Sequence, residues 1–134
     1  MISILLGGIT HHYIGSNFNY CNKINNYGTI ANPYAVVLAG DENKKLGAIL
    51  GKDSACGNIF GPMSSIRLSN NIDFIAGFYN TNKEKFEKIG LVSPSIYGVT
   101  PVVGANYKIP ITKKVSLNNI ISIGIITHAI SFNF

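Results

Sequence analysis

The sequence predicts an all-β protein, folded over residues 1–134 as a single antiparallel, eight-stranded, up-and-down β-barrel. Glycine and the β-branched residues are abundant, and no apolar stretch keeps a helical period over three turns. The apolar segments are instead short, regularly spaced and separated by turn residues. We expect strands at approximately 2–14, 28–40, 45–54, 58–68, 72–81, 96–108, 115–122 and 125–134.

The connections between these segments favour a simple meander. The first, "GSNFNYCNKINN", is a polar loop, and "GDENKK" between the second and third segments is a tight turn. The longest break, "NTNKEKFEKIGLVSP", has room for one helical turn before its Ser-Pro pair. Because a meander that closes on itself has no exposed edge strands, we prefer a barrel to a sandwich.

Side-chain alternation differs between the fifth and the last segment. In "IDFIAGFY" both faces are largely apolar, which indicates a strand covered on both sides. The last segment instead separates into two distinct faces. One face carries Ile130, Phe132 and Phe134, and the other carries Ala129, Ser131 and Asn133.

The composition limits the classes of partner. With 134 residues the chain forms one domain, and its 13% of charged residues is about half the usual share. The net charge of +5 suits a small anionic ligand or a lipid head group. The basic clusters fall in turn-like segments without interleaved aromatic residues, so we expect no nucleic-acid partner.

Cys21 and Cys56 are expected to be unpaired neutral thiols, although a bridge or a reactive pair stays open. Neither has a histidine or second cysteine at metal-ligand spacing, so we expect no metal and no cofactor. The opening "MISILLGGIT" lacks a basic leader and a cleavage site. This predicts a cytoplasmic protein if the chain is complete, or an outer-membrane protein if a signal peptide has been removed.

Residues able to carry chemistry lie at two strand ends. His12 ends the first apolar segment, and Asp53 and Ser54 end the third. A hydroxyl beside an imidazole that a carboxylate orients is the arrangement of a nucleophilic or acid–base site. Because neighbours in a regular strand face opposite sides, Asp53 and Ser54 can act together only where the strand has ended. Taken alone, an Asp-Ser pair after a strand is more often an ordinary turn.

The order of several short motifs resembles the PagP family of outer-membrane lipid A palmitoyltransferases, which are eight-stranded barrels. The family's "ITWH" in its first strand and "KDS" at the end of its third strand have counterparts here. An Asp-Glu turn, a "TAG" segment and an aromatic-x-aromatic end are also matched, the second only in part. The matching residues are Ile9-Thr10-His11-His12, Lys52-Asp53-Ser54, Asp41-Glu42, Ala76-Gly77 and Phe132-Asn133-Phe134.

The resemblance implies His12, Asp53 and Ser54 as catalytic residues, with Asp41, Lys52 and His11 as candidate substrate contacts. The family's N-terminal amphipathic helix and most of its interfacial aromatic residues have no counterpart. Lys83 is the only cation near the position of its functional arginine. These departures count against lipid A as the acceptor. The chain is also similar to short barrels encoded by phages.

Two functions follow as expectations. The first is an acyltransferase, or a related acyl or small-ligand enzyme, that holds an acyl chain in its lumen. The alternative is a non-catalytic cytosolic barrel that binds or sequesters a small anionic ligand. The apolar exterior would either face hydrocarbon or be hidden by self-association as a homo-oligomer, and the second is slightly preferred.

Overall fold

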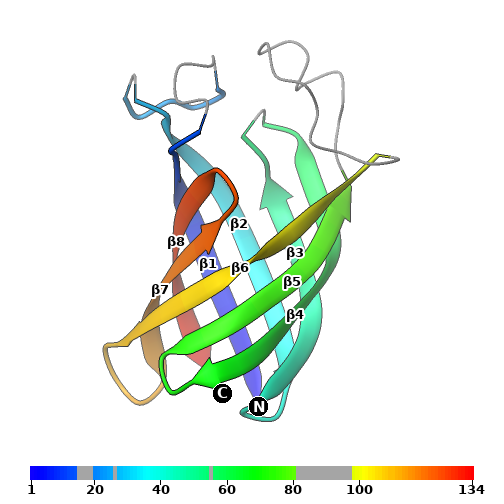
Figure 1. Ribbon diagram of the computed structural model, residues 1–134, viewed down its shortest axis with the longest axis vertical. Coiled ribbons are helices and arrows are strands. Elements are labelled where there is room, and N and C mark those ends of the chain that lie inside the picture. Colours follow the sequence, from blue (N-terminus) through cyan, green and yellow to red (C-terminus); the bar gives the residue numbers. More distant parts are fainter. Residues whose placement is uncertain (15–19, 26, 55, 81–97) are drawn as a thin grey trace.

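The computed structural model describes residues 1–14, 20–25, 27–54, 56–80 and 98–134, and these form a closed antiparallel barrel. Each strand pairs with its neighbours in sequence, and β1 pairs with β8 to close the barrel (Figure 1). The predicted fold class is confirmed. The strands are β1 (Ile2–His12), β2 (Thr29–Gly40), β3 (Lys44–Lys52), β4 (Asn58–Ser69), β5 (Ile72–Asn80), β6 (Val99–Pro110), β7 (Val115–Ser122) and β8 (Ile125–Asn133).

The observed strands differ from the predicted ones mainly at their ends. β1 stops at His12 and β3 at Lys52, so Asp53 and Ser54 lie beyond the strand. Positions 81, 96 and 97 of the predicted strands, and the possible helical turn between them, lie outside the described residues. No helix among the described residues is long and apolar enough to cross a membrane.

The more apolar face of β8 points outwards, and its small and polar face points into the barrel. Ala129 and Ser131 are 3% and 4% exposed, whereas Ile130 is 44% exposed. The prediction that β5 is covered on both sides is wrong, because Phe74 and Phe78 are exposed. On β8, therefore, the small and polar side chains occupy the narrow interior of the eight-stranded barrel, and the large apolar side chain of Ile130 lies outside.

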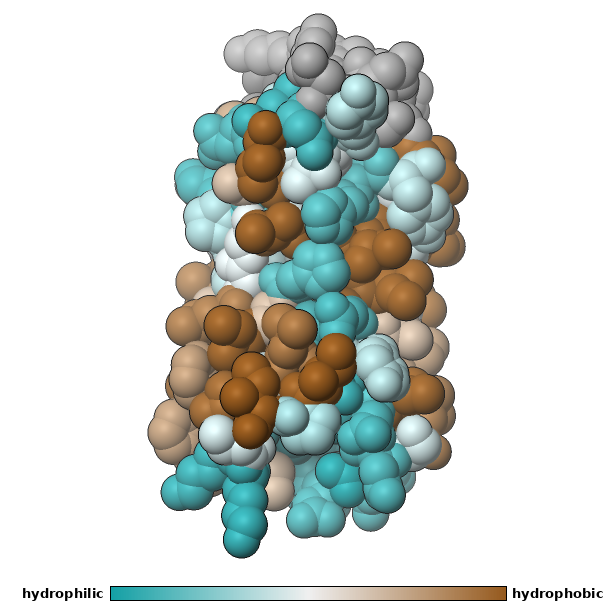
Figure 2. Space-filling model, turned by 90° about the vertical axis from the view of Figure 1, so that its left-hand side faces the viewer, coloured by the Kyte–Doolittle hydropathy of each residue, from teal (hydrophilic) through white to brown (hydrophobic). Residues whose placement is uncertain are grey.

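Apolar side chains cover much of the outer surface of the barrel. Figure 2 shows them gathered over the middle of one face, with hydrophilic residues at the lower end and in a strip along the barrel. Exposed apolar residues come from all eight strands. Examples are Leu6, Val37, Leu46, Phe60, Phe78, Val103, Ile121 and Ile130.

Buried side chains fill the middle of the lumen. Tyr34 lies across Gly7, where an added Cβ would come within 2.1 Å of the tyrosine ring, and its hydroxyl is 3.0 Å from the Thr127 hydroxyl. An acyl chain running lengthwise through the lumen would collide with this packed section. The buried apolar cluster consists of Leu5, Tyr34, Val36, Leu38, Ile49, Ile59, Met63, Ile75, Ile120 and Ala129.

Candidate functional site

A serine and a histidine from different hairpins meet at the end of the barrel opposite the chain termini. His12 is the last residue of β1 and faces inwards, where it is 6% exposed. Ser54 lies in the turn after β3, and its Oγ is 2.8 Å from Nε2 of His12. Because β1 and β3 run in the same direction on either side of β2, their ends reach the same rim.

The second ring nitrogen of His12 determines how this pair is protonated. Nδ1 lies 2.8 Å from the carbonyl oxygen of Gly28. A carbonyl only accepts hydrogen bonds, so Nδ1 carries the hydrogen and, in the neutral ring, Nε2 has a free lone pair. Nε2 therefore accepts the hydrogen bond from the Ser54 hydroxyl. This is the arrangement that a general base needs in front of a serine nucleophile.

A disulfide and a stacked tyrosine hold the pair from the side of the β1–β2 connection. Tyr20 stacks on the His12 ring, with 3.8 Å between centroids and 15° between planes. The next residue, Cys21, donates its backbone N–H to the Ser54 carbonyl at 3.0 Å and is bonded to Cys56. The expectation of unpaired thiols is wrong. Residues 35 apart in sequence meet because both follow strands that end at this rim, with a Cα–Cα distance of 5.7 Å.

Asp53 is buried and shapes the turn that carries Ser54. Its Oδ1 accepts the Gly57 N–H at 2.7 Å, and its own N–H donates to the Gly57 carbonyl at 2.9 Å. A Cβ at position 57 would lie 2.7 Å from the other carboxylate oxygen, so a side chain there would displace the Asp53 carboxylate. The role of orienting the imidazole, which the sequence indicated for Asp53, is filled by the Gly28 carbonyl.

Lys52 and His11 lie beside the pair in sequence but outside the lumen. The Lys52 ammonium group donates to the Asn58 side chain across the β3–β4 hairpin. The Nδ1 of His11 is 2.9 Å from the Thr29 hydroxyl, and its ring meets that of His128 edge to face at 5.1 Å. Strand alternation therefore separates both predicted substrate contacts from Ser54.

Asp41 lies at the opposite end of the barrel, in the β2–β3 turn. Its Oδ1 accepts the backbone N–H groups of Asn43 and Lys44 at 2.7 and 2.8 Å. These bonds, led by the one from Lys44, hold the pKa of the Asp41 carboxyl below its usual value. Since β3 has nine residues, it separates Asp41 from Ser54 by roughly 30 Å at about 3.3 Å per residue. Asp41 is a turn residue and not part of the site.

Gly28 and Tyr20 are site residues that sequence reasoning missed. Every residue has a backbone carbonyl, so nothing in the sequence singled out Gly28 as the partner of His12. Tyr20 sits in a polar loop, where only its neighbour Cys21 offered a hint. The described residues include no group of three His, Cys, Asp or Glu side chains that could hold a metal ion.

Comparisons with known proteins found no relative of this chain. No protein-family model matches the chain, and no curated protein or solved structure matches it significantly.

Proposed function

We propose that this protein is an acyl-transferring or acyl-hydrolysing enzyme in which Ser54 is the nucleophile and His12 the general base. The observation that supports this most directly is the 2.8 Å hydrogen bond from the Ser54 hydroxyl to Nε2 of His12, with Nδ1 held by Gly28. The Tyr20 ring stacked on His12 and the Cys21–Cys56 bond support the Ser54 hydroxyl and the imidazole in this arrangement. The positional similarity to the PagP motifs points to the same residues.

In the proposed reaction, the Ser54 oxygen attacks the carbonyl carbon of an ester while its proton moves to Nε2 of His12. The imidazolium then returns that proton to the departing alcohol, which leaves an acyl group on Ser54. In the second half, His12 takes the proton of an acceptor hydroxyl or of water as its oxygen attacks the acyl carbon. The bond between the acyl carbon and the Ser54 oxygen then breaks, and His12 returns the proton to that oxygen, so the enzyme is regenerated.

For the substrate we propose a lipid ester, with the barrel embedded in a bilayer. Apolar side chains point outwards on every strand, and polar and charged side chains line the end of the lumen away from Ser54. Both features follow the pattern of membrane barrels. The Cys21–Cys56 bond suits an oxidising compartment such as the periplasm. Ser54 lies at the rim of the barrel. In an embedded barrel the rim would lie where the hydrocarbon meets the head groups, which is also the depth of the ester bonds of lipids.

Polar groups on the outer surface of the barrel are bonded to one another, which reduces the cost of placing them beside lipid. His11 bonds to Thr29, and the Nδ1 of His128 is 2.8 Å from the side-chain oxygen of Asn119.

Covalent labelling tests the assignment of the nucleophile. The full chain in nonionic detergent is treated with a fluorophosphonate, whose phosphorus the serine oxygen attacks with loss of fluoride. We expect peptide mass spectrometry to find the label on Ser54, and we expect His12→Gln to abolish it because the base is lost. Ser64, whose hydroxyl donates to the Ala76 carbonyl, is an internal control. Equal labelling of Ser54 and Ser64, or labelling unaffected by His12→Gln, would contradict the assignment.

A matched pair of arginine substitutions tests the bilayer. Val103 is outward-facing near the middle of β6, whereas Ile123 lies in the β7–β8 turn at the rim. In phosphatidylcholine vesicles we expect Val103→Arg to lower the free energy of unfolding by about 2–4 kcal/mol, and Ile123→Arg by about 1 or less. Urea titration followed by circular dichroism measures both. Equal effects within about 0.5 kcal/mol would indicate a barrel with its outer face in water.

A further inference from the structure

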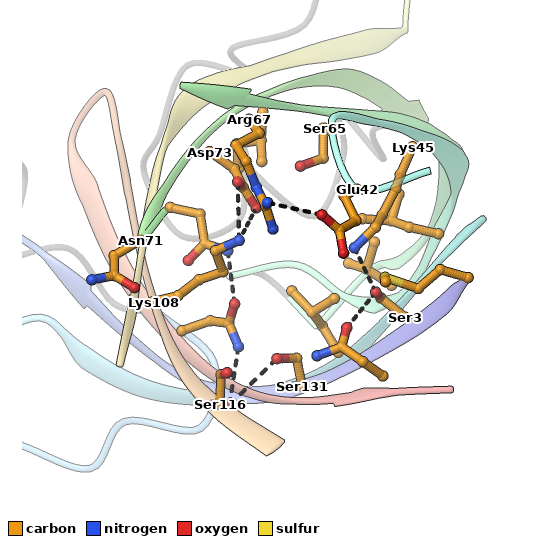
Figure 3. A pocket seen from close by; sticks show the side chains of 18 of the residues that line it. Ser3, Glu42, Lys45, Ser65, Arg67, Asn71, Asp73, Lys108, Ser116 and Ser131 are labelled. Atoms are coloured by element: carbon orange, nitrogen blue, oxygen red, sulfur yellow. Dashed lines mark hydrogen bonds and ion pairs between the residues drawn. The ribbon is translucent and has the colours of Figure 1, made fainter. Parts of the chain in front are cut away.

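The end of the lumen away from Ser54 contains a cavity of about 270 Å³ lined by charged side chains. Lys45, Arg67, Asp73 and Lys108 reach it from four consecutive strands, β3 to β6 (Figure 3). Residues of the β4–β5 and β6–β7 turns, including Lys113, also line it. Neither His12 nor Ser54 lines it, so it is separate from the proposed catalytic site.

Positive charge is in excess among the residues that line this cavity. They include four cationic side chains and two carboxylates. Lys108 is paired with Asp73 at 2.9 Å, and Arg67 with Glu42 at 3.5 Å. The Lys45 ammonium group is bonded to the Ser3 hydroxyl at 2.9 Å, and no carboxylate of the described residues lies within ion-pair distance of it. Its charge is therefore not compensated by an ion pair.

Two buried polar atoms at the same cavity also lack a hydrogen-bond partner among the described residues. One is the Nε of Arg67, a donor, and the other is the Oδ1 of Asn106, an acceptor. Asn106 is 4% exposed, and its amide nitrogen donates to Asn118 at 2.7 Å, which fixes the side chain. Leaving such groups unpaired is costly. A ligand with acceptor oxygens and a hydroxyl hydrogen would satisfy both atoms.

We propose that this end of the lumen binds a small phosphate dianion, either inorganic phosphate or a phosphomonoester. The two surplus positive charges match a dianion, and Arg67 offers the planar donor geometry that phosphate oxygens accept. A volume of about 270 Å³ lies just below the usual range for drug-sized ligands, which limits the ligand to a small molecule. A protonated phosphate oxygen or a hydroxyl of the ester would donate to Asn106.

A purely structural role for these charges explains less of the geometry. Two ion pairs already link the elements around this end of the lumen, and each cation in them faces a carboxylate. A half-buried lysine without a carboxylate partner adds a desolvation cost and no pairing energy. An anion bound beside Lys45 would offset that cost.

Isothermal titration of the full chain in nonionic detergent at low salt tests the proposal, with inorganic phosphate, glycerol 1-phosphate and acetate as separate probes. We expect saturable binding of one or both phosphates and much weaker binding of acetate. Tighter binding of glycerol 1-phosphate than of inorganic phosphate would identify an ester as the ligand, and the reverse would identify the free ion.

The matched variants are Lys45→Gln, which removes the inward charge, and Lys44→Gln, which removes an exposed charge next to it. Loss of one charge-assisted hydrogen bond should weaken phosphate binding about tenfold or more in Lys45→Gln, while Lys44→Gln stays within about twofold. The wild-type titration decides the matter even if Lys45→Gln does not fold. No saturable phosphate binding, equal affinity for acetate, or equal losses in the two variants would overturn the proposal.

Discussion

Ser54→Ala is expected to lower kcat/KM for a chromogenic fatty-acyl ester by about a thousandfold or more, because it removes the atom that we propose forms the acyl intermediate. His12→Ala should cause a loss of similar size, since it removes Nε2, the atom that accepts the hydrogen bond of the Ser54 hydroxyl. Steady-state hydrolysis by the full chain in detergent measures both. Retention of full turnover by either variant would exclude the proposed mechanism.

The double variant and a matched serine make this test more specific. In the proposed mechanism Ser54 and His12 act on the same proton, so the double variant should be no slower than the slower single variant. Losses that multiply would show that the two residues act independently. Ser64→Ala removes an outward hydroxyl bonded to a backbone carbonyl and should change kcat/KM by less than about twofold.

Asp73→Ala is expected to lower the free energy of unfolding by about 3–5 kcal/mol, because it leaves the Lys108 charge without its partner inside the barrel. The two side chains are 12% and 19% exposed and are joined at 2.9 and 3.0 Å. Water therefore screens this pair much less than a surface pair. Urea unfolding followed by circular dichroism measures the change.

Glu42→Ala provides the contrast. Its carboxylate is 68% exposed and 3.5 Å from Arg67, so its removal should cost no more than about 1 kcal/mol. Replacing both members of the inner pair by apolar residues, as in Asp73→Leu with Lys108→Met, should recover most of the lost stability. Similar losses in Asp73→Ala and Glu42→Ala would show that the inner pair is solvated like a surface pair.

Strand number, order and fold class were predictable because they depend on local patterns. Alternation and turn residues are properties of a few neighbouring positions, and a meander with short connections leaves little choice of topology. Strand ends were less predictable. The stop of β3 at Lys52 depends on the bonds between Asp53 and Gly57 within the turn, and residue types alone do not reveal these.

The site was predictable in part. The types and strand-end positions of His12 and Ser54 suggested a base and a nucleophile, and the structure places them in hydrogen-bond contact. The sequence indicated Asp53 as the group that orients the imidazole, whereas in the structure the Gly28 carbonyl holds Nδ1 of His12. A carboxylate is visible in the sequence and a backbone carbonyl is not. The Cys21–Cys56 bond likewise depended on two strand ends meeting at one rim.

The sequence by itself determined that each strand has two faces, because side chains alternate with a period of two wherever the backbone is extended. Only the tertiary structure decided which face points inwards. That choice depends on how eight strands close around a narrow lumen, which leaves Ile130 and Phe78 outside and places Ser131 inside. It also brings Lys45, Arg67 and Lys108 to one cavity, because closure joins positions that are far apart along the chain.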